Sequence, residues 1–144
     1  MNVYFACSIT GGRQDELIYQ KLVETLQQNG HQVPTALLAS PDVMPLEGMV
    51  SAEDVYARDV QWIRECDFLL AEVSTPSHGV GYEIGYALSL GKRVLCLYRN
   101  GRKVSKMILG NPHPQLTVRN YETSDQAVNL LRSYLKEMAT TEAG

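Results

Sequence analysis

FLLAEVSTPSHGVGYEIGYALSL, residues 68–90, is the most informative stretch of this chain. It opens with an apolar run, 68–73, of the length expected for a strand buried on both faces. It closes with apolar residues at helical spacing, which predict the buried face of a short helix: Val80, Ile84, Ala87 and Leu88. The polar turn between them follows the carboxyl end of the strand, where open parallel α/β sheets bind ligands. The stretch therefore predicts a strand, a ligand-binding turn and a helix.

One carboxylate, Glu83, lies among three glycines of this helix. We expect it in the first turn, where free amides and aligned peptide dipoles favour an ionised acid. An anionic carboxylate beside a glycine-lined cleft is a candidate nucleophile or base. The alternative is an acid that only stabilises the helix start, where acids are common. The glycines read G-x-G-x-x-x-G and no G-x-x-x-x-G-K-[ST] occurs, so neither NAD binding nor ATP hydrolysis is supported.

Length and composition indicate one ordinary domain. The chain has 144 residues, of which we assign 1–138 to the domain and 139–144 to a frayed tail. A net charge of −3 argues against a nucleic-acid polymer as partner, because such proteins carry a basic face. No apolar run is long enough to span a membrane, and the start does not resemble a signal peptide. Three cysteines in apolar surroundings predict core packing in a reducing compartment, so we expect a cytoplasmic protein.

Strands and helices alternate along the whole chain, which favours a parallel sheet covered by helices on both faces. The predicted fold is a Rossmann-like or flavodoxin-like three-layer sandwich, with five strands in the order 2-1-3-4-5. Its ligand crevice lies outside the carboxyl ends of strands 1, 3 and 4. The predicted strands are 2–7, 32–38, 68–73, 93–98 and 116–120, and the main helices start near 15 and 51, after the turn at 74–79, and near 123.

A second carboxylate, Asp59, lies on the apolar stripe of the helix that follows the capping-box sequence at 51–54. An acid aimed at the core is costly unless it has partners or lines a cavity. Asp59 is therefore either a structural acid bonded to a nearby loop or a functional group in the cleft. The functional interpretation is favoured because this helix leads directly into the strand at 68–73.

Two acids in one cleft are the groups needed to break a glycosidic bond. In a retaining mechanism one attacks the sugar carbon and the other handles the proton, with the carboxyls ~5 Å apart. Glu83 suits the nucleophile if the helix start keeps it charged. Asp59 suits the proton carrier, because apolar surroundings raise a carboxyl pKa. Tyr4, at the end of the first strand, can orient Glu83 through a hydrogen bond.

The motifs YFACSITGGR, RDVQW, AEVSTPSHGVGYEIGYAL and GRKVSKMI resemble those of the 2′-deoxynucleoside 5′-phosphate N-hydrolases, relatives of the nucleoside 2-deoxyribosyltransferases. The resemblance extends from Val3 to about Gly110, and its most specific part is GVGYEIG. It implies a homodimeric N-glycosidase that cleaves deoxynucleoside monophosphates into free base and 2-deoxyribose 5-phosphate through a covalent glycosyl-enzyme. It implies no cofactor and no metal.

The resemblance also assigns roles to residues. Glu83 is the nucleophile and Asp59 the second acid. Tyr4, which we count with the catalytic residues, lines the sugar site together with Ser8. The implied substrate-binding residues are Cys7, Ser8, Ile9, Thr10, Gly11, Gly12, Arg13, Ser77, Gly79, Ser105, Lys106 and Met107. Ser77 and Gly79 would bind the phosphate, and the neighbouring subunit would lend Ser105. From spacing alone, Ser77 is better explained as an ordinary turn or cap serine, and Ser105 is equally well explained as a helix cap.

Thr10 departs from the family pattern, which has an arginine two residues after the serine of the first strand. Losing a guanidinium removes a bidentate contact, so the preferred base and the choice between ribose and deoxyribose stay open. Two other functions also remain. A transferase would exchange bases through the same intermediate, and a nucleotide-binding sensor would use this architecture without chemistry.

Overall fold

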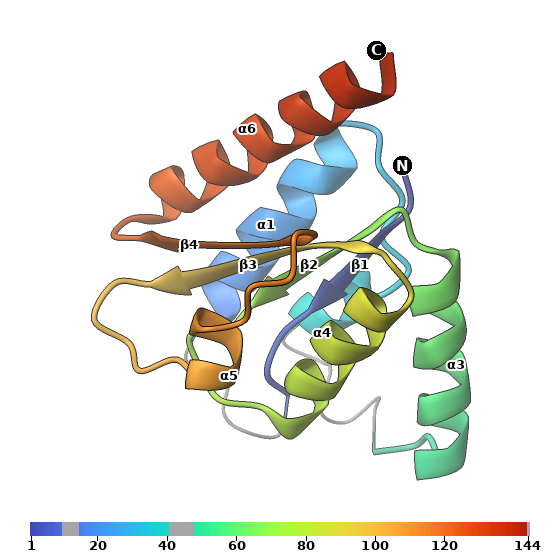
Figure 1. The fold of residues 1–144 in the computed structure, drawn as a ribbon. Helices are drawn as coiled ribbons and strands as arrows, with labels where there is room; N and C mark the ends of the chain where they lie inside the picture. The colour runs from blue at the N-terminus through green and yellow to red at the C-terminus, as the bar shows by residue number, and fades with distance from the viewer. Residues whose placement is uncertain (10–14, 41–47, 144) are drawn as a thin grey trace.

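The structure is a computed structural model that describes residues 1–9, 15–40 and 48–143. Its centre is a parallel sheet whose strands follow the order β1-β2-β3-β4 (Figure 1). The strands are β1 (Val3–Ala6), β2 (Phe68–Glu72), β3 (Arg93–Arg99) and β4 (Leu116–Tyr121). Parallel strands joined by helices place all four carboxyl ends at one edge, and the loops at that edge carry the candidate site.

The predicted five-stranded sheet with order 2-1-3-4-5 is wrong, because 32–38 does not form a strand. In this segment Gln32 makes a single parallel bridge to Asn2, and a short 3₁₀ helix, η1 (Ala36–Ala39), follows. Pro34 cannot donate a ladder hydrogen bond. The hydroxyl of Thr35 accepts from the Phe5 amide at 2.8 Å, so a side chain occupies the place of a strand partner. The parallel α/β arrangement itself agrees with the prediction.

Helices cover both faces of the sheet (Figure 1). Helices α1 (Glu16–Gln28) and α6 (Ser124–Ala143) pack on one face, and α3 (Ala52–Glu65) and α4 (His78–Ser89) on the other. Alternate strand residues point to opposite faces, so Phe5 packs towards α1 while Tyr4 packs towards α3 and α4. The sequence of β1 thereby delivers one tyrosine hydroxyl to the α3–α4 layer.

The start of α3 agrees with the sequence. The Ser51 hydroxyl accepts from the Asp54 amide at 3.1 Å and begins α3, as its capping-box spacing predicts.

Helix α6 continues to Ala143, so much of the stretch assigned to a frayed tail is helical. The three cysteines, Cys7, Cys66 and Cys96, are buried in the core, as their apolar surroundings predict. Within the described residues, no helix combines the length and apolar character needed to cross a bilayer.

Candidate active site

Glu83 lies in the second turn of α4, not in the first. The helix begins at His78 behind Ser77, whose hydroxyl accepts from the Val80 amide at 3.3 Å. The first turn contains no acid. The free amides of the helix start are therefore one turn away from Glu83, and the effect of the helix dipole falls off within that distance.

Burial, rather than the helix start, dominates the chemistry of Glu83. Loss of hydration raises the pKa of its carboxyl to about 7. The approach of the Tyr4 hydroxyl and the charge of Arg58 lower this pKa, and the charge of Asp59 raises it. The expectation that the helix start keeps Glu83 charged is thus wrong. The acid sits near the midpoint of its titration at neutral pH, which suits a group that must change its charge or bonding during a reaction.

Tyr4 supplies the second polar group of the site. Its side chain is 1% exposed and sits beneath α3 and α4. Burial and the nearby carboxylates Glu83 and Asp59 raise the pKa of its hydroxyl, which therefore stays protonated. Neither the Tyr4 hydroxyl nor Glu83 Oε2 has a hydrogen-bond partner of normal geometry among the described residues. Buried polar atoms without partners are rare and costly, so a bound ligand is a natural partner for them.

Asp59 and Arg58 approach the site from α3. Arg58 Nε lies 2.8 Å from Asp59 Oδ1, and its guanidinium carbon lies 5.0 Å from the centre of the Trp62 ring. Both charges influence Glu83 and Tyr4. The structure therefore brings Glu83, Asp59 and Tyr4 together, each from a different element. The sequence prediction missed Arg58, although its position directly before Asp59 and four residues before Trp62 was a usable signal.

Ser77 and Gly79 border the same carboxylate. A Cβ atom placed on Gly79 would lie 3.6 Å from Glu83 Oε1 and 3.9 Å from Ser77 Oγ. Glycine thus leaves open space between the serine hydroxyl and the acid. Ser77 also caps α4, so its structural interpretation holds in this structure.

The loop after β1 was predicted to bind substrate. Cys7 and Ser8 are buried directly after the strand, and Ile9 packs at the margin of the core. Thr10, Gly11, Gly12 and Arg13 lie outside the described residues, so their predicted roles stay predictions.

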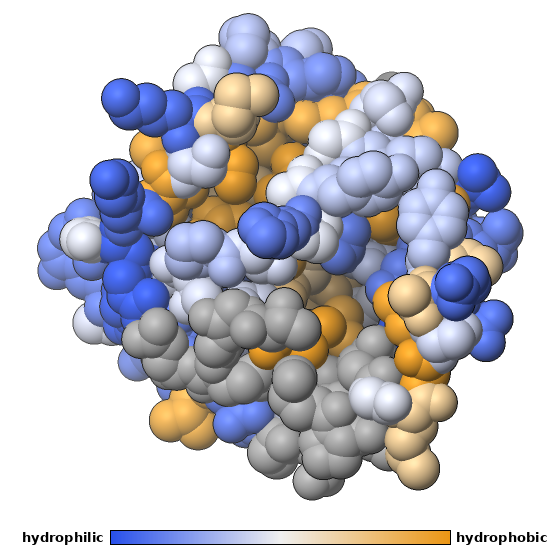
Figure 2. All heavy atoms as spheres, turned by 90° about the horizontal axis from the view of Figure 1, so that it is seen from below, coloured by the Kyte–Doolittle hydropathy of each residue, from blue (hydrophilic) through white to orange (hydrophobic). Residues whose placement is uncertain are grey.

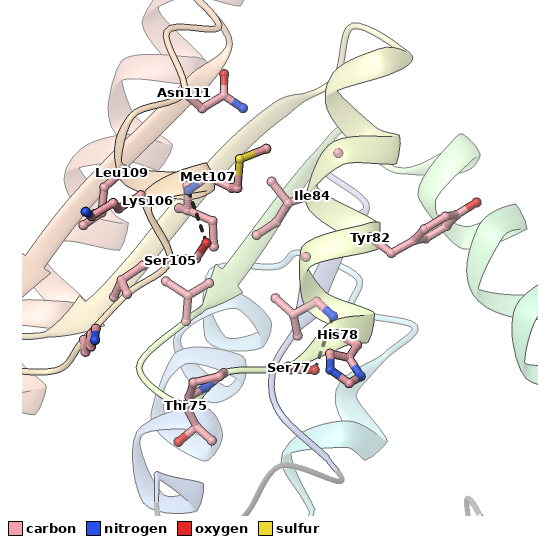
Figure 3. Close-up of a pocket in the computed structure, with 18 residues that line it drawn as sticks. Thr75, Ser77, His78, Tyr82, Ile84, Ser105, Lys106, Met107, Leu109 and Asn111 are labelled. Carbon is pink, nitrogen blue, oxygen red and sulfur yellow. Dashed lines mark hydrogen bonds between the residues drawn. The ribbon is translucent and has the colours of Figure 1, made fainter.

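Ser105, Lys106 and Met107 lie across a groove of about 910 Å³ between α4 and the short helix α5 (Lys106–Leu109) (Figure 3). Ser77 lies on the opposite wall of this groove, and Glu83 is not among its described lining residues. Ser105 caps α5, since its hydroxyl accepts from the Met107 amide at 3.2 Å. Residues on either side of Glu83, among them Tyr82 and Ile84, line the same groove as these three residues.

The groove is largely apolar and open. The Met107 side chain is 83% exposed, and Leu109 and Tyr82 also present apolar surface. Viewed from below, the molecule shows hydrophobic residues in hollows that hydrophilic residues surround (Figure 2). Apolar surface of this kind typically marks a place where another molecule binds.

Comparison with known proteins places these features in context. Residues 3–131 match the family model described as nucleoside 2-deoxyribosyltransferase. A Danio rerio protein named 5-hydroxymethyl-dUMP N-hydrolase is 41% identical, covering 96% of this chain and 98% of that protein. A protein of the same name from Esox lucius is 38% identical and covers 96% and 99%. The structure of the Clostridium botulinum CMP N-glycosidase BcmB has a TM-score of 0.71 at 21% identity, covering 92% of this chain and 98% of that one, so it shares the fold.

Proposed function

Because this chain belongs to the nucleoside 2-deoxyribosyltransferase family, we propose that it hydrolyses the N-glycosidic bond of deoxynucleoside 5′-monophosphates. The products are the free base and 2-deoxyribose 5-phosphate. Two relatives that align over nearly their whole length carry the name 5-hydroxymethyl-dUMP N-hydrolase, which makes this nucleotide the first substrate to test.

One observation carries the proposal: a buried carboxyl oxygen, Glu83 Oε2, has no described partner and lies with Tyr4 and Asp59 in one cluster. In the first step Glu83 attacks C1′, the bond to the base breaks, and Asp59 gives the leaving base a proton. In the second step water attacks C1′, releases Glu83 and returns a proton to Asp59. The carboxyl pair therefore holds one proton at the start, and substrate binding must leave it on Asp59.

Support for a phosphate site comes from Ser77 and Gly79, which stand at the amino end of α4 beside Glu83. Free amides at a helix start bind anions, and a serine hydroxyl adds a donor. A phosphate held there would place the deoxyribose next to the carboxyl pair.

The activity test uses 5-hydroxymethyl-dUMP and a panel of other ribo- and deoxyribonucleoside monophosphates, with liberated base as the readout. We expect base release from deoxynucleotides and much slower release from the matching deoxynucleosides without phosphate. Preference for the unphosphorylated form, with base exchange when a second base is added, would identify a transferase instead. Binding without any turnover would identify a sensor.

We further propose that the protein works as a homodimer in which Ser105 completes the neighbour's phosphate site. The support is the open apolar groove beside Ser105, in which Met107 and Leu109 are exposed. The matched test mixes two inactive variants, Glu83→Gln and Ser105→Ala. Each mixed dimer regains one complete site, so an equal mixture recovers about a quarter of wild-type activity. No recovery, from subunits shown to exchange, would reject the shared site. We also propose a cytoplasmic location, which the burial of all three cysteines in the core supports.

A further inference from the structure

Asp15 occupies a helix N-cap position but does not make the hydrogen bond that an aspartate usually makes there. It is the N-cap residue of α1, where an aspartate side chain usually accepts a hydrogen bond from the first amides of the helix. Here no such bond forms. Both carboxylate oxygens instead bind other loops: Oδ1 accepts from Arg102 Nη2 at 2.8 Å and Oδ2 accepts from the Thr75 hydroxyl at 2.9 Å. The Asp15 side chain is 2% exposed, so water does not compete for these bonds.

The two partners belong to the loops that follow β2 and β3. Thr75 is separated from Ser77 by Pro76 alone, and proline fixes its own φ and restricts the residue before it. Arg102 lies three residues before Ser105. Gly101, with φ +86°, allows the turn that brings Arg102 back towards the sheet edge. One carboxylate therefore joins the segments that lead to both serines.

Ser74, in the loop after β2, makes further hydrogen bonds that hold this loop in place. Its carbonyl accepts from Arg102 Nη1 at 3.4 Å. Its hydroxyl accepts from the Arg99 amide at 2.7 Å and donates to Glu72 Oε2 at 2.9 Å. The segment before Ser77 is thus held from β3 and from the Asp15 bridge at once, which leaves it little freedom.

We propose that Asp15, through Arg102 and Thr75, is a positioning residue that sets the geometry of the phosphate-binding serines Ser77 and Ser105. A buried ion pair is weak evidence for stability, because the loss of hydration offsets most of the attraction. Its orienting effect on two loops is the more specific consequence. This inference rests on the proposed function, since the serines need a phosphate to bind.

The experiment compares binding of 2-deoxyribose 5-phosphate with binding of 2-deoxyribose by calorimetry, and KM with kcat for 5-hydroxymethyl-dUMP. The variants are Thr75→Val, which removes one hydroxyl, Arg102→Met, and Arg102→Lys as the conservative substitution. Matched controls are Thr140→Val and Arg119→Met, whose side chains bond only to carbonyls of their own helix or strand.

We expect Thr75→Val to raise KM about fivefold and Arg102→Met about 20-fold, with kcat changed much less. Affinity for the sugar phosphate falls in parallel, weak binding of the unphosphorylated sugar does not change, and Arg102→Lys recovers part of the loss. A fall in kcat with an unchanged KM, or no effect beyond the controls, would overturn the inference. If the wild type releases no base, the proposed function fails separately, while the sugar-phosphate titrations still decide whether Asp15 positions an anion site.

Discussion

Two glutamates with buried carboxyl oxygens, each beside a tyrosine, differ in how those oxygens are bonded. Glu72, at the end of β2, is fully buried and accepts hydrogen bonds from the Ser74 amide, the Ser74 hydroxyl and the Tyr121 hydroxyl. Glu83, on α4, leaves Oε2 without a partner among the described residues, and its neighbour Tyr4 is in the same position. Burial raises the pKa of both acids.

The difference separates a structural acid from a reactive one. The bonds that Glu72 accepts offset part of the cost of its burial and join the ends of β2 and β4. Glu83 leaves Oε2 without a partner within the described part of the chain, so the fold keeps a buried polar atom that a substrate can satisfy. The two acids also differ in exposure, because Glu72 is fully buried whereas the Glu83 residue is partly exposed.

The largest expected effect separates the two glutamates by activity. Glu83→Gln lowers kcat at least about 10³-fold, because the amide cannot form the glycosyl ester. Glu72→Gln changes kcat by less than about threefold but destabilises the protein by ~1–3 kcal/mol, since one of the two acceptor oxygens is replaced by an NH2 group that faces other donors. Steady-state kinetics and urea unfolding of both variants check this. If both variants lost kcat equally, Glu83 could not be distinguished from Glu72 as the reactive acid.

Asp59→Asn comes next. It removes the proton carrier, so kcat falls by about 10²-fold. The loss shrinks for a substrate whose base leaves readily without a proton, and activity with such an activated nucleotide is the measurement. An equal loss for both substrates would show that Asp59 acts only through the placement of Arg58.

The comparison also predicts an effect on stability with a defined sign. The pKa of Glu83 is about 7 in the folded protein and near 4.5 when unfolded. As pH rises between these values, the unfolded state loses its proton first, so the wild type loses stability. Glu83→Gln lacks this penalty and should be more stable than the wild type above pH 7, by on the order of 2 kcal/mol. Urea unfolding at pH 4 and pH 8 tests this; equal stabilities at pH 8 would contradict it.

The smallest expected effect is a shift in the pH dependence of kcat/KM. The groups that face Glu83 are Tyr4 from β1, with Asp59 and Arg58 from α3. Because the active carboxyl pair holds one proton, kcat/KM falls as pH rises through about 7, where the pair loses that proton. Arg58→Gln removes a charge that lowers the pKa of Glu83, so this fall moves up by about half a unit. Arg119→Gln, on the exposed strand β4, is the control and leaves the profile in place.

The sequence predicted the parts of the molecule that depend on local pattern. The strand and helix within residues 68–90 and the cap at Ser51 follow from periodicity and spacing, and topology brings Tyr4 and Glu83 to one edge. Asp59 joins them because α3 packs at the same end, which the sequence left open. The predicted strand at 32–38 is wrong because the Thr35 hydroxyl, rather than a backbone carbonyl, accepts from the Phe5 amide. No sequence pattern encodes this contact.

The prediction that Glu83 stays ionised is wrong for a similar reason. Counting from the start of the glycine-rich segment placed it in the first turn, whereas Ser77 begins the helix and burial decides the pKa. The ion pair of Asp15 with Arg102 could not be predicted from the sequence, because the two residues are 87 positions apart along the chain. Long-range polar contacts of this kind require the folded arrangement.

Mass spectrometry of the acid-quenched reaction is the most direct measurement. Cleavage after Arg64 and Lys92 yields one peptide, residues 65–92, that contains both Glu72 and Glu83. During turnover of 5-hydroxymethyl-dUMP, a fraction of this peptide should carry the mass of a deoxyribosyl phosphate, and its fragments should place that mass on Glu83. Rapid base release with no adduct at any time after mixing, or an adduct on another residue, would contradict covalent catalysis by Glu83.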